Sequence, residues 1–247
     1  MNNSHLPFKF FETPFADMWK KGLFYSKYEP NSEYRYVDTD RPGKSINDDG
    51  WTYKFNEYGF RSDPFDQRSE FNVLISGCSL TVGIGVDYEY TWGQVLKKKL
   101  EEHLGKTVTI WNLAQSSCSP DYTVRSIYKT VDTFNPDLIA VCWPCETRFE
   151  LPSNNPATPG VSKDYALGED DYPKLLVREG WHEAQLEKNI IFLKMLCEKH
   201  NILLVHGPGE LTDFGIDPDG SGRDGAHPGK LWHKTFADLV FDYYKDK

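Results

Sequence analysis

The sequence has no long apolar run, no cluster of basic residues and few cysteines, and each absence argues against a class of protein. None of its 247 residues lie in an apolar stretch of the roughly 18 residues that a membrane-spanning helix needs. The net charge is -9 without a block of Lys and Arg, which argues against a nucleic-acid partner because phosphate binding requires clustered cations. The first residues lack the charged and apolar regions of a signal peptide, so we expect a cytoplasmic protein.

Cysteines are too few, for a chain of this length, to serve as a disulfide framework. They number five, and the odd count favours free thiols in a reducing compartment: Cys78, Cys118, Cys142, Cys145 and Cys197. Cys142 and Cys145 have C-x-x-C spacing, which can indicate redox chemistry or half of a zinc site. Because free cysteine is also a common small buried residue, the spacing alone does not decide between these interpretations.

Strand and helix patterns alternate from residue 71 onward. Short apolar or β-branched runs predict strands at residues 71–76, 107–112, 137–143 and 202–206. Helical stripes lie between these runs, at residues 91–104, after Ser119, at residues 186–197 and after Pro228. This alternation predicts an α/β fold, with a mainly parallel sheet between two layers of helices. In such a sheet, binding and active sites form at the edge where loops leave the carboxyl ends of the strands.

Two helix starts carry capping signals. Thr91 and Gln94 have capping-box spacing, and Ser119 followed by Pro120 is typical of an N-cap and the first helical position.

The domain organisation is expected to be simple. Residues 1–65 are aromatic and poorly periodic, and we interpret them as an N-terminal extension packed on a main domain of residues 66–247. Residues 151–180 are rich in Pro, Gly, Asn and Asp and predict an insertion near the site that could act as a lid.

The segment FNVLISGCSLTVGIGV allows three interpretations: a phosphate cradle, a nucleophilic serine on a sharp turn, or a turn alone. A dinucleotide fingerprint needs G-x-G-x-x-G, but five residues separate Gly77 from Gly83. A phosphate-binding P-loop needs a Lys after its last glycine, and none follows Gly83 or Gly85. The phosphate hypothesis is therefore disfavoured, and the serine and the plain turn remain. Gly77 is then expected to let the chain turn sharply after the strand and to present Ser79.

Ser79 would need a base to become a nucleophile, and His227 is the leading candidate. It lies in DGAHP before the last predicted helix, three residues after Asp224, whose carboxylate could orient the imidazole. His206 ends a predicted strand and is a reserve candidate. The other histidines lie on the extension or on predicted helices, where structural roles suffice: His5, His103, His182, His200 and His233.

Several segments, in order, resemble the sequence blocks of the SGNH or GDSL hydrolases. GCSLTVGIGV resembles the first block, TIWNLAQSSCSPDYT the second, PDLIAVCWPCETR the third and DGAHP the fifth. FNEYGFRS is similar to a stretch often found ahead of the first block. The resemblance covers the chain from about residue 55 onward, and its specificity comes from the ordered set rather than from one block.

The resemblance implies a flavodoxin-like α/β/α sandwich that hydrolyses esters through a Ser-His-Asp triad. Ser79 would be the nucleophile, His227 the base and later the acid, and Asp224 the orienting carboxylate. The implied reaction is that of an esterase or O-deacetylase on a small-molecule or glycan ester, with no cofactor. The oxyanion would be held by the backbone N–H of Ser79, a second-block group and a third-block side chain.

The sequence departs from the family pattern at three positions. Cys78 replaces an acidic residue, and Ser117 replaces a glycine whose dihedral angles it would have to adopt. The third-block Asn aligns with Glu146, which cannot donate to an oxyanion unless it is protonated. Thr147 or Arg148 could supply that donor, or Arg148 could form an ordinary ion pair with Glu146. A catalytically impaired binding or structural module, or a cysteine-based redox or zinc site, are therefore the alternative functions.

Overall fold

The computed structural model describes residues 30–36, 51–149, 161–162, 180–208 and 227–247. Three sequence predictions lie wholly or mostly outside these residues: the position of Asp224, the N-terminal extension of residues 1–65 and the insertion at residues 151–180.

The centre of the fold is a four-stranded parallel sheet in the order β4-β3-β5-β8. The strands are β3 (Phe71–Gly77), β4 (Val108–Asn112), β5 (Leu138–Trp143) and β8 (Leu203–Pro208). Each falls within a residue or two of an apolar run in the sequence. The two inner strands, β3 and β5, are almost entirely buried, as expected for strands covered on both faces.

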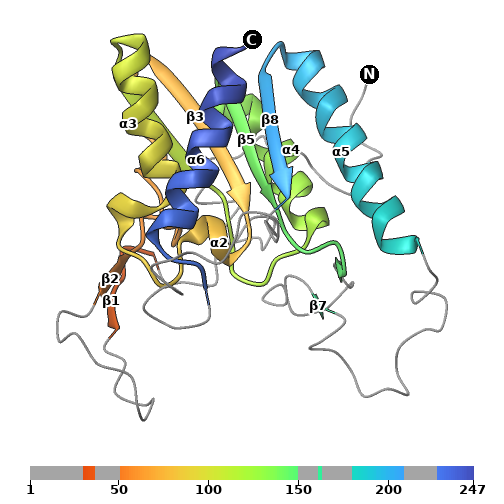
Figure 1. Cartoon of the computed structure of the whole chain (residues 1–247), viewed down its shortest axis with the longest axis horizontal. Helices are drawn as coiled ribbons and strands as arrows, with labels where there is room; N and C mark the ends of the chain where they lie inside the picture. The colour runs from red at the N-terminus through yellow and green to blue at the C-terminus, as the bar shows by residue number, and fades with distance from the viewer. Residues whose placement is uncertain (1–29, 37–50, 150–160, 163–179, 209–226) are drawn as a thin grey trace, which may run out of the picture.

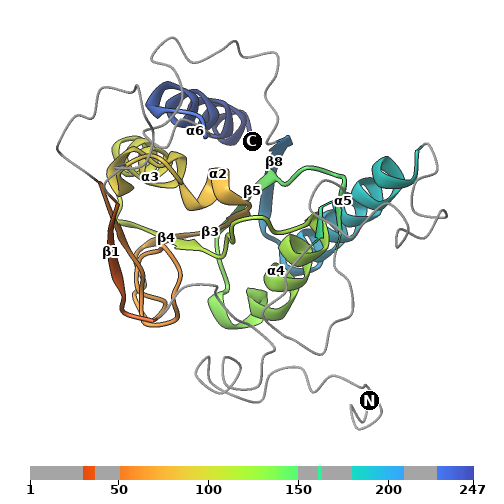
Figure 2. The same ribbon diagram turned by 90° about the horizontal axis from the view of Figure 1, so that it is seen from below.

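Helices cover both faces of the sheet. On one face lie α3 (Trp92–Leu104) and α6 (Lys230–Lys245), and on the other lie α4 (Pro120–Phe134) and α5 (Trp181–His200), as Figures 1 and 2 show. The predicted α/β class, a mainly parallel sheet between two helical layers, is confirmed. Since side chains alternate along a strand, Val73 and Ile75 pack toward α3 and α6, whereas Leu74 packs toward α4 and α5.

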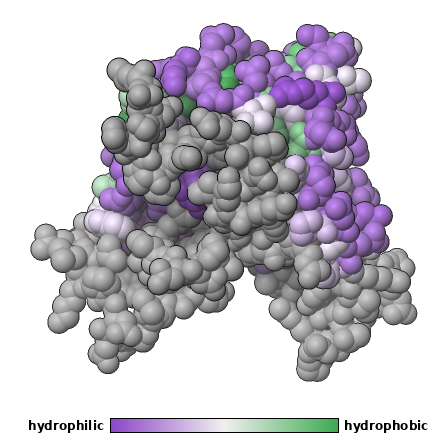
Figure 3. Space-filling model, turned by 180° about the vertical axis from the view of Figure 1, so that it is seen from behind, coloured by the Kyte–Doolittle hydropathy of each residue, from purple (hydrophilic) through white to green (hydrophobic). Residues whose placement is uncertain are grey.

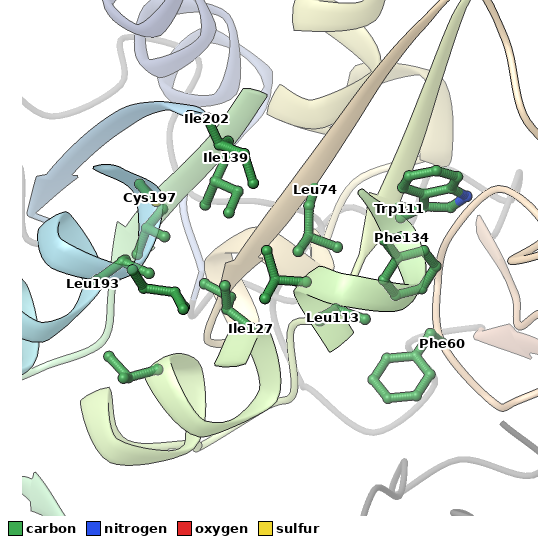
Figure 4. Close-up of a cluster of buried hydrophobic side chains, with 14 of the residues drawn as sticks. Phe60, Leu74, Trp111, Leu113, Ile127, Phe134, Ile139, Leu193, Cys197 and Ile202 are labelled. Atoms are coloured by element: carbon green, nitrogen blue, oxygen red, sulfur yellow. The ribbon is translucent and has the colours of Figure 1, made fainter. Parts of the chain in front are cut away.

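The core beneath α4 and α5 is rich in aromatic side chains. Figure 4 shows Leu74 and Ile139 from the sheet pointing toward Ile127 and Leu193 from the helices. Trp111 and Phe134 pack with ring centroids 4.6 Å apart. The described part of the face in Figure 3 is mainly hydrophilic. Within the described ranges, no helix has the length and apolar character needed to cross a bilayer.

The N-terminal part of the chain is joined to the edge of the sheet. β1 (Glu33–Tyr36) and β2 (Trp51–Lys54) form an antiparallel pair. The segment after β2 then hydrogen-bonds to the edge strand β4: Ile110 N–H donates to Asp63 Oδ2 (3.2 Å) and Asn112 N–H to Ser62 Oγ (2.9 Å). Phe60 and Phe65 pack in the same core as α4 and α5. The domain boundary at residue 65 stays a prediction.

Both predicted helix starts are confirmed, but the capping box predicted at one of them does not form. Ser119 Oγ accepts the Tyr122 N–H at 3.1 Å with Pro120 in the first turn, as predicted. Thr91 does precede α3, but its hydroxyl donates back to the Tyr88 carbonyl (2.7 Å) and caps nothing. The Trp92 N–H instead donates to His233 Nδ1 (3.3 Å) from α6. The first N–H of α3 is thus satisfied by a distant acceptor, and no capping-box contact forms between Thr91 and Gln94.

We predict that His233 makes the protein sensitive to mild acid. The imidazole is 1% exposed, and burial lowers its pKa to about 3, with the charges of Arg61 and His227 acting in the same direction. Because the unfolded chain binds the proton near pH 6.5 and the folded chain does not, this stability is present above pH 6.5 and is lost as the pH falls toward 3.

Thermal unfolding of the wild type and of His233→Gln at pH 7 and pH 5 measures this effect. His233 should account for about 2 kcal/mol of the wild type's loss of stability between these pH values. The pH dependence of His233→Gln should be smaller by that amount, whereas an equal dependence in both proteins would contradict the assignment.

Candidate active site

The carboxyl ends of the parallel strands form one edge of the molecule, and most of the predicted site residues lie there. In Figure 1 the arrowheads of β3 and β8 point toward the short helix α2 (Ser79–Val82), and α6 begins at the same edge. The 3-10 helix η2 (Tyr88–Tyr90) is also close to the start of α6, since Lys230 Nζ lies 3.4 Å from the Tyr90 ring centroid. The fold therefore gathers loops that are far apart in the sequence.

Gly77 ends β3 in a conformation that other residues rarely adopt. Its φ is 155°, and a Cβ added there would lie 2.5 Å from the Cys142 carbonyl oxygen and 2.3 Å from Thr81 Oγ1. Real Cβ atoms do not approach this closely, so only glycine fits between β5 and α2. The predicted role of Gly77, a sharp turn that presents Ser79, agrees with this geometry. Ser79 is the first residue of α2 and is partly exposed.

The loop after β4 packs directly against this turn. The Gln115 N–H (3.2 Å) and the Cys118 thiol (3.1 Å) both donate to the carbonyl of Gly77. Ser117 lies between them with φ 60°, in the left-handed region, and is exposed. Ser117, which replaces the glycine of the family pattern, thus adopts the left-handed dihedral angles. This conformation costs about 1–2 kcal/mol.

Asn112, at the end of β4, joins the second-block loop to α2. Its amide Nδ2 donates to the carbonyls of Thr81 (3.0 Å) and Arg61 (3.1 Å), and its Oδ1 accepts the Ala114 N–H at 2.9 Å. The sequence shows a strand ending in Asn but not this bridging role, because the two carbonyls come from distant segments.

Arg61 hydrogen-bonds to the C-terminal end of α2 and to the loop that follows it. The side chain is 2% exposed, its Nη1 donates to the carbonyls of Val82 and Gly83, and its Nη2 donates to Val86 (2.9 Å). Its guanidinium also lies 4.5 Å from the Tyr53 ring centroid. The segment FNEYGFRS does not reveal this role of Arg61 by itself, and the only signal in the sequence is a charged residue directly after the aromatic Phe60.

The third-block turn follows β5 and contains Glu146, Thr147 and Arg148. Arg148 N–H closes the turn on the Cys145 carbonyl (3.1 Å), and Arg148 opens β6 (Arg148–Phe149), which pairs with β7 (Val161–Ser162). Thr147 Oγ1 lies 3.1 Å from Cys145 Sγ, within hydrogen-bonding distance. Both Glu146 and Arg148 are described, and they form no ion pair with each other, so the alternative of a local ion pair is wrong for this structure.

A pocket of about 290 Å³ opens beside this turn, between the ends of β5 and β8 and the start of α5. Trp143, Leu186 and Ile190 give it an apolar wall, and Glu146 and His206 add polar groups. Trp143 Nε1–H donates to His206 Nδ1 (3.2 Å), and burial and the nearby Lys194 lower the pKa of His206. His206, the reserve candidate for the base, is therefore held as a neutral acceptor for Trp143.

The structure does not join the predicted triad. His227 precedes α6, is partly exposed, and lies close enough to His233 for its charge to lower the pKa of that residue. The Ser79 hydroxyl makes no hydrogen bond to His227, and Asp224 lies outside the described residues. Catalytic hydrogen bonds are often long in an unliganded enzyme and tighten only with substrate, so the geometry leaves the triad as a prediction.

The cysteines of the site are free thiols. Cys78 and Cys118 pack together with Tyr122 behind Ser79, and burial raises the pKa of Cys118 to about 12. Cys142 and Cys145 are not joined by a disulfide, and burial raises the pKa of Cys142 well above its usual value. Among the described residues, no group of three or more His, Cys, Asp or Glu is arranged to hold a metal ion.

Comparison with known proteins gives structural likenesses only. No family model matches the chain, and no curated protein matches it. A crystal structure of TesA is similar with 14% identity, 69% of this chain and 96% of that chain covered, and a TM-score of 0.46. A lipase/acylhydrolase from Enterococcus faecalis has 12% identity, coverage of 71% and 96%, and a TM-score of 0.41. A lipolytic protein of the G-D-S-L family from Veillonella parvula has 12% identity, coverage of 71% and 98%, and a TM-score of 0.38. Solved structures similar to this chain thus include members of the family that its sequence resembles.

Proposed function

We propose that the protein is an ester hydrolase of the SGNH/GDSL type, an esterase or O-deacetylase with Ser79 as its nucleophile. The observation that carries the proposal is the Gly77 turn, which leaves room for no side chain and is followed by a partly exposed Ser79 at the carboxyl edge. A simple chain reversal requires neither a position that only glycine can occupy nor a left-handed Ser117 in the neighbouring loop. The two together therefore favour a functional turn.

In the proposed reaction, Ser79 Oγ attacks the ester carbonyl while His227 takes the hydroxyl proton. Asp224 orients the imidazole, and His227 later donates the proton to the leaving alcohol. Water then hydrolyses the acyl-enzyme by the same route in reverse. The backbone N–H groups of Ser79 and Ser117 bind the oxyanion, together with a third donor from the turn of residues 146–148.

We further propose that the acyl group of the substrate enters the pocket beside Trp143. This pocket lies one strand away from Ser79, because Gly77 pairs with Cys142, the residue before Trp143. Its apolar wall suits an aliphatic chain. Since a group of the size of water occupies about 30 Å³, a pocket of about 290 Å³ suits a short chain. The alcohol part is a small molecule or a sugar, for which the partly exposed Trp181 at the start of α5 offers an aromatic face.

Hydrolysis of p-nitrophenyl acetate and butyrate by the wild type and by His227→Ala tests the function. We expect measurable turnover by the wild type and a decrease in kcat of about 10³-fold or more in the variant, because an unassisted hydroxyl is a poor nucleophile. His103→Ala, which changes an exposed histidine on α3, is the matched control and should retain activity. Equal rates for His227→Ala and wild type would contradict the proposal, and an inactive wild type would favour a non-catalytic binding module.

A further inference from the structure

Arg148 is partly buried, and one nitrogen of its guanidinium has no partner in the described structure. Its Nη1 is inaccessible to solvent and has no hydrogen-bond acceptor among the described residues. No ion pair of the guanidinium to a described carboxylate is present either. A buried cationic nitrogen without an acceptor is costly, and such a group in a native protein calls for an explanation such as a bound water, an ion or a catalytic role.

The surroundings of Arg148 place its charge beside the second-block loop. β6, which Arg148 opens, packs against α4, whose first turn follows that loop. The positive charge of Arg148 reaches the Cys118 thiol, where it acts against the burial that raises the pKa of this group. Cys118 in turn donates to the carbonyl of Gly77, two residues before Ser79. The charge of Arg148 therefore acts on a side chain that hydrogen-bonds to the turn that presents Ser79.

The other two side chains of the turn are poorer donors. Glu146 is a carboxylate that accepts hydrogen bonds when ionised, and it lines the pocket on the α5 side. The Thr147 hydroxyl is already within hydrogen-bonding distance of Cys145 Sγ. Of the three candidates, Arg148 alone combines permanent donors with an unused, solvent-inaccessible nitrogen.

We propose that the guanidinium of Arg148 is the third donor of the oxyanion hole, in place of the Asn that the family resemblance implies. This inference rests on the proposed function. In the resting protein the buried nitrogen has no anionic partner among the described residues, and it gains one when negative charge develops on the carbonyl oxygen. The interaction is therefore stronger in the transition state than with the neutral substrate, and it accelerates the chemical step.

Kinetics of Arg148→Ala and Arg148→Lys on p-nitrophenyl butyrate test this role. We expect kcat to fall about 10²–10³-fold in Arg148→Ala with KM changed only a few-fold, the signature of a lost transition-state contact. Arg148→Lys should recover part of the rate, and guanidinium ion at sub-denaturing concentration should partly rescue Arg148→Ala. Arg68→Ala is the control, since Arg68 bonds the Thr133 carbonyl near the far end of α4 and should leave kcat unchanged.

Several outcomes would overturn the inference. An unchanged kcat in a folded Arg148→Ala shows that the charge is not used, and an increased KM with unchanged kcat shows a substrate anchor instead. If Arg148→Ala does not fold, a folded Arg148→Met variant, which keeps an apolar stem but has no donor, gives the same result by retaining full kcat. A wild type that is inactive toward the ester overturns the proposed function and this inference together. By contrast, activity that requires Ser79 but not Arg148 overturns the inference alone.

Discussion

Replacement of Ser79 by alanine is expected to lower kcat/KM for an activated ester by about 10³-fold or more, without loss of stability. Alanine keeps the helical geometry at the start of α2 and removes only the hydroxyl that would attack the carbonyl. Because the Ser79 hydroxyl makes no hydrogen bond to a described residue, its removal leaves no buried group unpaired. Initial rates and a thermal unfolding curve for the same preparation measure both parts.

Ser76→Ala is the matched control for this substitution. Ser76 is fully buried in β3, three residues before Ser79, and its hydroxyl has no hydrogen-bond partner in the described part of the chain. Its removal should change neither activity nor, by more than about 1 kcal/mol, stability. A loss of activity in Ser76→Ala equal to that in Ser79→Ala would show that any change near this turn is harmful, and would remove the specific case for Ser79.

Replacement of Arg61 by methionine is expected to lower the free energy of unfolding by about 3–5 kcal/mol. The substitution keeps an apolar stem of similar length but leaves the carbonyls of Val82, Gly83 and Val86 without their charged donor. For a chain of this size, such a loss corresponds to a decrease in Tm of roughly 10 °C. Urea denaturation followed by tryptophan fluorescence gives the free energy directly.

Arg68→Met provides the comparison for Arg61→Met. Arg68 also stacks on an aromatic ring, that of Trp111, but it makes one backbone hydrogen bond and is exposed. Its replacement should cost about 1 kcal/mol or less. Equal losses in the two variants would mean that the three carbonyl contacts of Arg61 contribute nothing beyond ordinary packing.

The framework of the fold was predictable because it depends on local patterns. The buried strands appear as apolar runs, and the start of α4 is encoded by adjacent residues, Ser119 and Pro120, whose geometry the structure confirms. Gly77 was identified as a turn residue from its position after a strand. The reason that only glycine fits there, the approach of Cys142 and Thr81, required the neighbouring strand and helix.

Contacts between distant segments were not predictable in the same way. The acceptor at the start of α3 comes from His233, 141 residues from Trp92, so the local capping-box pattern was misleading. Arg61 reaches carbonyls 21 to 25 residues away, and nothing in its own segment specifies them. The position of Ser117 in the left-handed region is likewise set by the loop that surrounds it rather than by a preference of serine.

The candidate site was partly predictable. The order of the blocks led to Ser79, Ser117 and the turn of residues 146–148, and each of these follows the carboxyl end of a strand of the parallel sheet. The relation of Ser79 to His227 and Asp224 stays a prediction, because it depends on loop conformations that no sequence pattern defines.

The measurement that tests the account most directly is covalent labelling with a fluorophosphonate, followed by peptide mass spectrometry. These reagents modify an activated serine and require both its nucleophilicity and an oxyanion site. We predict one adduct on the wild type, located at Ser79, absent from Ser79→Ala and formed much more slowly in His227→Ala. An unlabelled wild type, an adduct on another residue, or undiminished labelling of Ser79→Ala would contradict the proposal that Ser79 is the nucleophile of an ester hydrolase.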